Sequence, residues 1–285
     1  MLYFLLLLAM ACSRQNDDQG GAPAFESTPQ SSPVDANVVK EASGIADSKK
    51  NPGHLWVQQD SGNPPALFLL KHDGTVQKTV HLKNATNRDW EDMCLANGPD
   101  AGKNYLYIGE IGDNSLVHSE YIIYRFEEPA ASVDTVQLAD KITFQYKDGN
   151  HDAEAFLVDG TTKDIYIITK NDNPSKIFKL AWPYSTSATN IAEQVGVLTY
   201  NFVVGAALSP DGKGVVVKTY GAINYYPRSS GESIAQALAK TPVSLPYKAE
   251  PQGEAITFAA DNTGYYTLSE KSLAPSVTLY FYKRK

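Results

Sequence analysis

The sequence predicts an all-β fold, and within that class a five-bladed β-propeller. One observation is a pattern that recurs at about 50 residues, an interval typical of propeller blades. The other is the content of each repeat, which consists of short apolar strands separated by turns rich in Gly, Asp and Pro. Four antiparallel strands per repeat can cover one face of the next repeat, and closing the ring removes exposed sheet edges.

Each repeat opens with small or acidic residues directly before or within a short apolar strand. The openings start at Glu41, Glu91, Glu154, Val204 and Glu254. The second strands of the repeats end at Asp60, Glu110, Lys170, Tyr220 and Glu270. Because the two series have nearly the same spacing, two alignments of the repeats agree.

The later strands of each repeat carry their own turn signals, such as His72-Asp-Gly-Thr75 in the first. The last repeat has no fourth strand after the segment that ends at Tyr282. We expect residues 35–40, just before the first opening, to supply that strand and close the ring. A six-bladed ring is the alternative, but it would need another blade within the insertion at 127–140, which is too short.

The N-terminal residues resemble a bacterial lipoprotein signal. An apolar run too short to span a bilayer ends in small residues before Cys12. We expect cleavage after residue 11, acylation of Cys12 and an extracytoplasmic protein, either periplasmic or on the cell surface. Residues 12–34 are poor in apolar side chains and are expected to form a disordered tether, followed by the β-propeller domain at 35–285. The alternative is a buried N-terminal strand or helix.

The charge balance limits the possible partners. The net charge is −7 and the sequence pI is about 5.3. Proteins that bind nucleic acid use clustered Lys and Arg against phosphates, so a nucleic-acid partner is excluded. We expect a monomer that contacts the membrane only through its lipid. Its partner is expected to be a small anionic ligand or a protein. Cys94 lies in an apolar strand and is expected to be a small buried hydrophobic residue.

The repeat predicts an acidic site in the central channel. The first strand of each blade lines that channel, so Glu41, Glu91, Glu154 and Glu254 are expected at equivalent places around one axis. Side chains two residues away share a face of a strand, which places Ser43, Asp89, Asp152 and Gln252 beside them. Trp90 and Asp92 are expected to point the other way, into the packing of the blade and its rim.

Converging carboxylates repel one another and need a neutralising charge. Calcium prefers oxygen ligands and would supply that charge, as would basic side chains of the same mouth. At the rim we expect Asp60, Glu110, Lys170, Tyr220 and Glu270, with Lys218 and Arg125 nearby. Such an asymmetric mouth suits a metal-bridged anionic ligand such as a phosphate ester, and it equally suits internal salt bridges.

Several short motifs resemble the phytase-like, or esterase-like, secreted bacterial propellers. They are Glu41-Ala-Ser-Gly-Ile-Ala46, Asp152-Ala-Glu154-Ala, Gly253-Glu254-Ala-Ile256 and Leu268-Ser-Glu270. The resemblance covers nearly all of residues 41–282. It implies calcium near the channel glutamates and, for true phytases, phosphomonoesterase activity. This chain has few Lys and Arg residues for a highly phosphorylated substrate, and it lacks dense Asp clusters.

Two functions follow from these features. The first is a binding propeller with a calcium site at the channel mouth. The second is a calcium-dependent phosphoric ester hydrolase in which Glu91, Glu154 and Glu254 hold the metal. In that hydrolase, Asp89 or Asp152 would activate water, while Lys170, Lys218 and Arg125 would hold the anion. The sequence contains no G-x-S-x-G motif and no phosphate-binding G-x-x-x-x-G-K motif.

Overall fold

The computed structural model describes residues 21–272 and 276–285. The predicted signal peptide (1–11), Cys12 and the first part of the predicted tether lie outside these residues. Within them the chain is almost entirely β-structure, with one short helix, α1 (Ile234–Leu238). The predicted all-β class is confirmed. None of the described residues forms a helix long and apolar enough to cross a bilayer.

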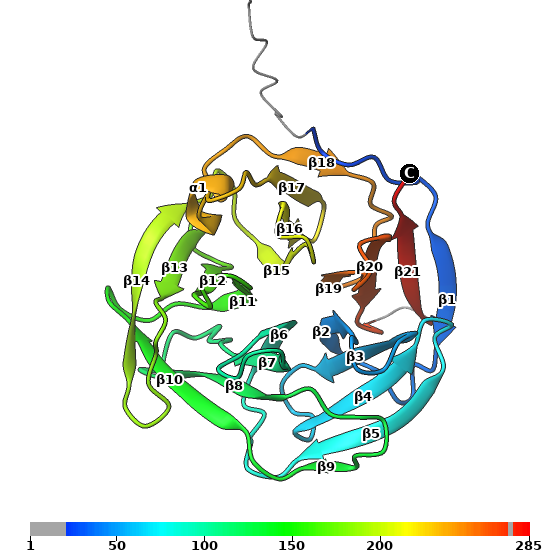
Figure 1. Ribbon diagram of the computed structural model, residues 1–285, viewed down its shortest axis with the longest axis horizontal. Coiled ribbons are helices and arrows are strands. Elements are labelled where there is room, and N and C mark those ends of the chain that lie inside the picture. The colour runs from blue at the N-terminus through cyan, green and yellow to red at the C-terminus, as the bar shows by residue number, and fades with distance from the viewer. Residues whose placement is uncertain (1–20, 273–275) are drawn as a thin grey trace, which may run out of the picture.

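The inner strands lie around a common axis (Figure 1). They are β2 (Ala42–Asp47), β6 (Trp90–Asn97), β11 (Ala153–Val158), β15 (Val203–Leu208) and β19 (Gly253–Phe258). Each contacts the next in chain order, and β19 contacts β2, so the ring of inner strands is closed.

Further strands extend outward from each inner strand and define five units. The first unit contains β3 (His54–Gln59), β4 (Ala66–Lys71), β5 (Val76–Leu82) and the short β9 (Thr135–Val136). The second contains β7 (Asn104–Glu110), β8 (Tyr121–Glu127) and β10 (Asp140–Tyr146). The third contains β12 (Ile165–Thr169), β13 (Lys176–Leu180) and β14 (Asn190–Val197).

The fourth unit contains β16 (Gly214–Thr219), β17 (Ile223–Pro227) and β18 (Val243–Leu245), and the fifth contains β20 (Gly264–Ser269), β21 (Val277–Lys283) and β1 (Gln30–Val34). Neighbouring strands within a unit pair antiparallel, except for the short β9, which pairs in parallel with β5. At the outside of the ring β10 and β14 pair in parallel, which joins the second and third units into one eight-stranded sheet.

An N-terminal strand does complete the last unit, but it lies earlier than expected. β1 pairs antiparallel with β21, and Pro33 is tolerated there because β1 is an edge strand. Phe25 is buried and forms an isolated bridge with Arg284. Residues 35–40 form a turn instead, in which the carbonyl of Asp35 accepts hydrogen bonds from the backbone N–H groups of Val38 and Val39.

Buried apolar side chains of the described residues form five clusters, and each cluster lies between neighbouring units. Trp56 of the first unit, for example, shares a cluster with Tyr124 of the second. Ile45 of the first unit shares one with Leu268 of the fifth. The free energy of burial therefore holds each unit to its two neighbours, and the ring has no gap in its apolar packing.

The inner strands share an irregularity that the sequence pattern does not reveal. The ladder to the second strand is interrupted in every unit at the same place: Ala42/Gly44, Trp90/Met93, Ala153/Ala155, Val203/Gly205 and Gly253/Ala255. A β-bulge inserts an extra residue and turns its side chain. The residues at the interruptions, which are therefore equivalent, are Ser43, Glu91, Glu154, Val204 and Glu254.

Removing the closing segment is expected to destabilise the protein. A chain that begins at Asp35 lacks Phe25 and Val34, which are 6% and 5% exposed, and leaves the edge of β21 unpaired. Burying two such side chains contributes about 3–5 kcal/mol. The thermal midpoint should therefore fall by about 10 °C relative to a chain that begins at Gly21. Equal midpoints for the two chains would contradict the role of β1.

Candidate functional site

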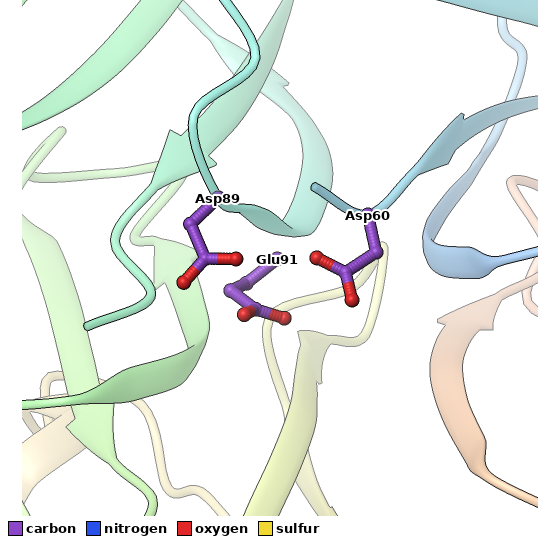
Figure 2. A group of neighbouring side chains, drawn as sticks. All are labelled: Asp60, Asp89 and Glu91. Atoms are coloured by element: carbon purple, nitrogen blue, oxygen red, sulfur yellow. The ribbon is translucent and has the colours of Figure 1, made fainter. Parts of the chain in front are cut away.

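Three carboxylates converge where the first and second units meet. One oxygen from each of Asp60, Asp89 and Glu91 lies within 4.8 Å of the other two. Figure 2 shows the carboxylates of Asp60 and Asp89 pointing toward each other, with that of Glu91 between them. Asp60 follows β3, Asp89 precedes β6, and Glu91 occupies the irregularity of β6.

Asn87 holds the segments that carry these carboxylates together. Its side-chain amide donates to the carbonyl oxygens of Gln59 and Asp60 at 3.0 and 2.9 Å. Its side-chain oxygen accepts a hydrogen bond from the backbone N–H of Trp90 at 3.1 Å. Asn87 therefore links the end of β3 to the start of β6. A single Asn before a strand is a common turn residue, so the sequence pattern does not distinguish Asn87 from an ordinary turn.

Gly112 leaves room for the cluster. A Cβ atom there would lie 2.3 Å from Oδ2 of Asp89 and 2.5 Å from Oε1 of Glu91. The backbone N–H of Gly112 donates to the carbonyl of Asp89 at 3.3 Å. Any larger residue at this position would displace the carboxylates. Gly112 is thus a second residue of the site that motif analysis did not find.

A second group of carboxylates faces this cluster. Glu154 pairs with the ammonium group of Lys170. Glu254 accepts a hydrogen bond from the hydroxyl of Tyr220 at 2.9 Å, and Glu270 lies close enough to sense the charge of Glu254 and Asp60. We call the two groups together the acidic mouth. Its carboxylates are Asp60, Asp89, Glu91, Glu154, Glu254 and Glu270.

Burial and mutual repulsion disfavour the ionised forms of these groups. Burial, with the charges of Asp60 and Asp152, raises the pKa of Asp89 to about 6. Burial raises the pKa of Glu254 to about 7, and burial together with the charge of Glu254 raises that of Glu270 to about 8. The pKa of Glu91 is raised well above its ordinary value, first by burial and then by the charge of Glu154.

Glu154 follows the same trend, whereas Lys170 does not. Burial and the charge of Glu254 raise the pKa of Glu154 well above the ordinary value, although Lys170 opposes the shift. Burial disfavours the charged form of Lys170, but the Glu154 carboxylate outweighs it and raises the lysine pKa. Lys170 therefore remains cationic at neutral pH within a group of carboxylates that resist ionisation.

Asp92 lies at the centre of the ring and not in the packing of the blade, where it was expected. One of its oxygens accepts a hydrogen bond from the N–H of Met93 at 2.8 Å. The other accepts from the N–H groups of Phe156 and Ala206, at 3.3 and 3.0 Å. These three donors are equivalent residues of β6, β11 and β15. Asp92 is fully buried, so it ties three inner strands together beneath the acidic mouth.

Trp90 is fully buried in the apolar cluster between the first and second units, as expected. At the position equivalent to Asp92, the other four units carry only small residues, namely Gly44, Ala155, Gly205 and Ala255. Only one side chain of any length therefore occupies this level of the channel. An Asp among four Gly and Ala residues is the sequence signal that would have placed it there.

Two of the predicted residues belong to other positions of the repeat. Glu41 precedes the irregularity of β2 and is equivalent to Asp89 and Asp152, while Ser43 occupies the position of Glu91. Glu41 is exposed and accepts a hydrogen bond from Asn63 at 2.6 Å. The expected alignment matched Glu41 to Glu91 by residue type, which placed it two positions out of register.

Glu110 lies one residue before the rim position, which Ile111 occupies in the second unit. The Glu110 carboxylate accepts hydrogen bonds from the backbone N–H of Arg88 at 3.2 Å and from the hydroxyl of Thr86 at 3.3 Å. Glu110 therefore stabilises the segment before β6 and does not face the acidic mouth.

The predicted anion-binding residues are not brought together. Lys218 is fully buried, where its ammonium group donates to the hydroxyl of Tyr247 at 3.0 Å and to the carbonyl of Gly253. Arg125 pairs with Asp140 on β10 at 2.6 Å. Of the predicted cations, Lys170 is the one that pairs with a carboxylate of the acidic mouth.

Asp152 is equivalent to Asp89 but is held by protein donors. Its carboxylate accepts hydrogen bonds from the backbone N–H of Asp113 at 2.8 Å and from the side-chain amide of Asn171 at 2.6 Å. These bonds order the loops around it. Cys94 is partly buried in the apolar packing between the second and third units, and burial raises the pKa of its thiol. The protonated thiol matches its expected role as a small hydrophobic residue.

No protein-family model matches the sequence, and no curated protein matches it significantly. Among solved structures, hydrazine synthase from Kuenenia stuttgartiensis is similar to this chain with a TM-score of 0.49 and 8% sequence identity. The similarity covers 87% of this chain and 96% of that chain. At this level of similarity it carries no argument about function. Function is therefore inferred from the side chains of this chain.

The stability of the metal-free protein should fall as the pH rises from about 5 to about 8. In this range the native chain keeps protons on Asp89, Glu254 and Glu270 that the unfolded chain has lost. The unfolding free energy decreases with pH wherever the native state binds more protons. Urea denaturation in EGTA at several pH values measures this slope. Glu270→Gln should flatten it, whereas stability that stays level or increases would contradict the raised pKa values.

Proposed function

We propose that this chain is a five-bladed β-propeller whose acidic mouth binds a calcium ion and that serves as a binding module for a small anionic ligand or a protein partner. The observation that carries the proposal is the convergence of Asp60, Asp89 and Glu91. These carboxylates come from two units of the ring. They lie beside a second group of carboxylates, in which Glu154 pairs with Lys170.

The propeller assignment is supported by the closed ring of inner strands and by the five apolar clusters between neighbouring units. In each unit, four antiparallel strands extend outward from the axis (Figure 1). In a propeller each blade covers the face of the next, which is the arrangement that the clusters describe. The strand β1 would then close the ring by pairing both ends of the chain in one blade.

Calcium fits the donor set of the mouth. All the candidate ligand atoms are carboxylate oxygens, which hard divalent cations prefer over nitrogen or sulfur ligands. Glu154 is 3% exposed, and its Oε2 is buried without a hydrogen-bond partner among the described residues. A buried carboxylate oxygen without a partner is costly unless a cation or donor meets it. A bound cation would also offset the repulsion that raises the pKa of Glu91.

Each residue of the proposed calcium site would have a separate role. Asp60, Asp89 and Glu91 would hold the ion, while Asn87 and Gly112 keep their segments in place. The ion would supply a positive charge at the open end of the mouth. An anionic group of a ligand or partner would meet that charge there, with Lys170 at the rim. Asp92 would keep β6, β11 and β15 in register beneath the ion.

The location outside the cytoplasm is proposed from the sequence around Cys12, which resembles a lipoprotein signal. Acylation would attach the chain to a bacterial membrane, either in the periplasm or on the cell surface. The residues that follow would act as a tether before the ordered segment that begins by Phe25. The acidic mouth would then be exposed to millimolar extracellular calcium, a concentration at which weak sites are filled.

Hydrolysis of phosphate esters receives less support than binding. A phosphoryl-transfer site stabilises the charge that develops on the phosphoryl oxygens with nearby cations. Lys218 and Arg125 are engaged with Tyr247 and Asp140 instead. Only Lys170 would remain beside the ion, and it pairs with Glu154. A binding role is therefore the function that the geometry supports best.

Calcium should stabilise the protein. At a concentration of about one hundred times the dissociation constant, one bound ion adds about 2.7 kcal/mol. The thermal midpoint should rise by about 5–10 °C, and EGTA should reverse the rise. Glu91→Gln should abolish the effect, because it removes a ligand and a charge from the centre of the cluster. Glu193→Gln, at an exposed residue on β14, is the matched control and should respond like the natural protein.

Two results would contradict these expectations. A midpoint that calcium leaves unchanged in the natural protein would contradict the site. A full response in Glu91→Gln would contradict the assignment of its ligands.

The hydrolase alternative has its own test. The purified protein with calcium should show no turnover of a phosphomonoester panel above the buffer rate, because its anion-binding cations are engaged elsewhere. Turnover that disappears in both Asp89→Asn and Lys170→Met, while both variants keep the natural melting temperature, would instead establish the hydrolase.

A further inference from the structure

The ammonium group of Lys170 is a cation within the acidic mouth, and its position in the repeat indicates its role. In the register of the repeats, Lys170 stands where the first unit has Asp60. The other units have Ile111, Tyr220 and Glu270 there. At this position of the third unit, an ammonium group thus stands in place of the carboxylate that Asp60 supplies in the first unit.

The repeat generates five junctions, each combining the rim residue of one unit with two positions of the next inner strand. Only the junction of the first and second units has three carboxylates, Asp60, Asp89 and Glu91. The following junction combines Ile111 with Asp152 and Glu154. The junction after that combines Lys170 with Phe202 and Val204, so it has no carboxylate of its own.

Lys170 therefore reaches toward Glu154 of its own unit. Its ammonium group contacts Oε1 of Glu154 and lies 5.6 Å from the centre of the Tyr220 ring. Tyr220 in turn donates its hydroxyl hydrogen to Glu254. Glu154 and Glu254 therefore each already have a hydrogen-bond donor on one carboxylate oxygen.

Glu154 connects the two halves of the mouth. Oε1 meets Lys170, whereas Oε2 is buried and has no hydrogen-bond partner among the described residues. Among the neighbouring charges, that of Glu154 raises the pKa of Glu91 the most. One carboxylate thus contacts a cation through one oxygen and lies close enough to the group of three carboxylates to raise the pKa of Glu91.

We infer that Lys170 acts as a built-in second cation that limits the acidic mouth to one divalent ion and fixes Glu154 so that its free oxygen faces that ion. This inference rests on the proposed calcium site. The Lys170 ammonium group already neutralises the half of the mouth where a second ion would bind. A second ion there would have to displace a buried ammonium group from its carboxylate, which is strongly unfavourable.

Calcium stoichiometry tests the inference. Equilibrium dialysis with calcium should give one ion per chain for the natural protein and for Lys170→Arg, which keeps the charge. Lys170→Gln should bind two, because Glu154 and Glu254 then lose their internal cation. Two ions in the natural protein, or one ion in Lys170→Gln, would overturn the inference. In the second case the natural protein still binds one ion, so the proposed function stands.

Glu154→Gln provides an independent measurement if Lys170→Gln does not fold. It removes the shared carboxylate but leaves Asp60, Asp89 and Glu91 in place. The stoichiometry should remain one, and calcium affinity should fall at least about tenfold, as expected for loss of a supporting carboxylate. Unchanged affinity would overturn the role assigned to Glu154. A natural protein that binds no calcium would refute both the inference and the proposed function.

Discussion

The inner strands approach one another closely enough to exclude side chains at two positions. A Cβ atom at Gly44 would lie 2.7 Å from the backbone nitrogen of Met93. A Cβ atom at Gly205 would lie 2.6 Å from the carbonyl oxygen of Glu254. Strands packed this tightly leave little space at the axis, so the side chains at their first residues are forced together. The short inner positions and the crowded carboxylates are thus two results of one geometry.

Apolar packing between the units supplies the free energy for this crowding. Five buried clusters lie between neighbouring units, and they stabilise the ring regardless of what lies at its axis. The mouth can therefore contain groups such as Glu91 and Glu154, whose ionised forms are disfavoured by burial. Functional sites often carry such locally unfavourable groups because the surrounding fold holds them in place.

The sequence predicted the ring better than the details of its mouth. The repeat of apolar strands identified every inner strand, and it placed Glu91, Glu154 and Glu254 at equivalent positions. It misplaced Glu41, because the alignment matched acidic residues to one another, whereas the first unit has Ser43 at the position of Glu91. It also missed Asn87 and Gly112, whose roles depend on contacts with residues that are distant in sequence. The closing strand was predicted at the wrong residues, because β1 is a polar edge strand whose few apolar residues give little sequence signal.

Crystallography can directly locate the cation that the three converging carboxylates are proposed to bind. Crystals of the protein soaked in terbium, which replaces calcium and scatters anomalously, would show the ion in a difference map. The predicted result is a peak at about 2.3–2.6 Å from oxygens of Asp60, Asp89 and Glu91. A map with no peak at these residues in fully soaked crystals would refute the cation site.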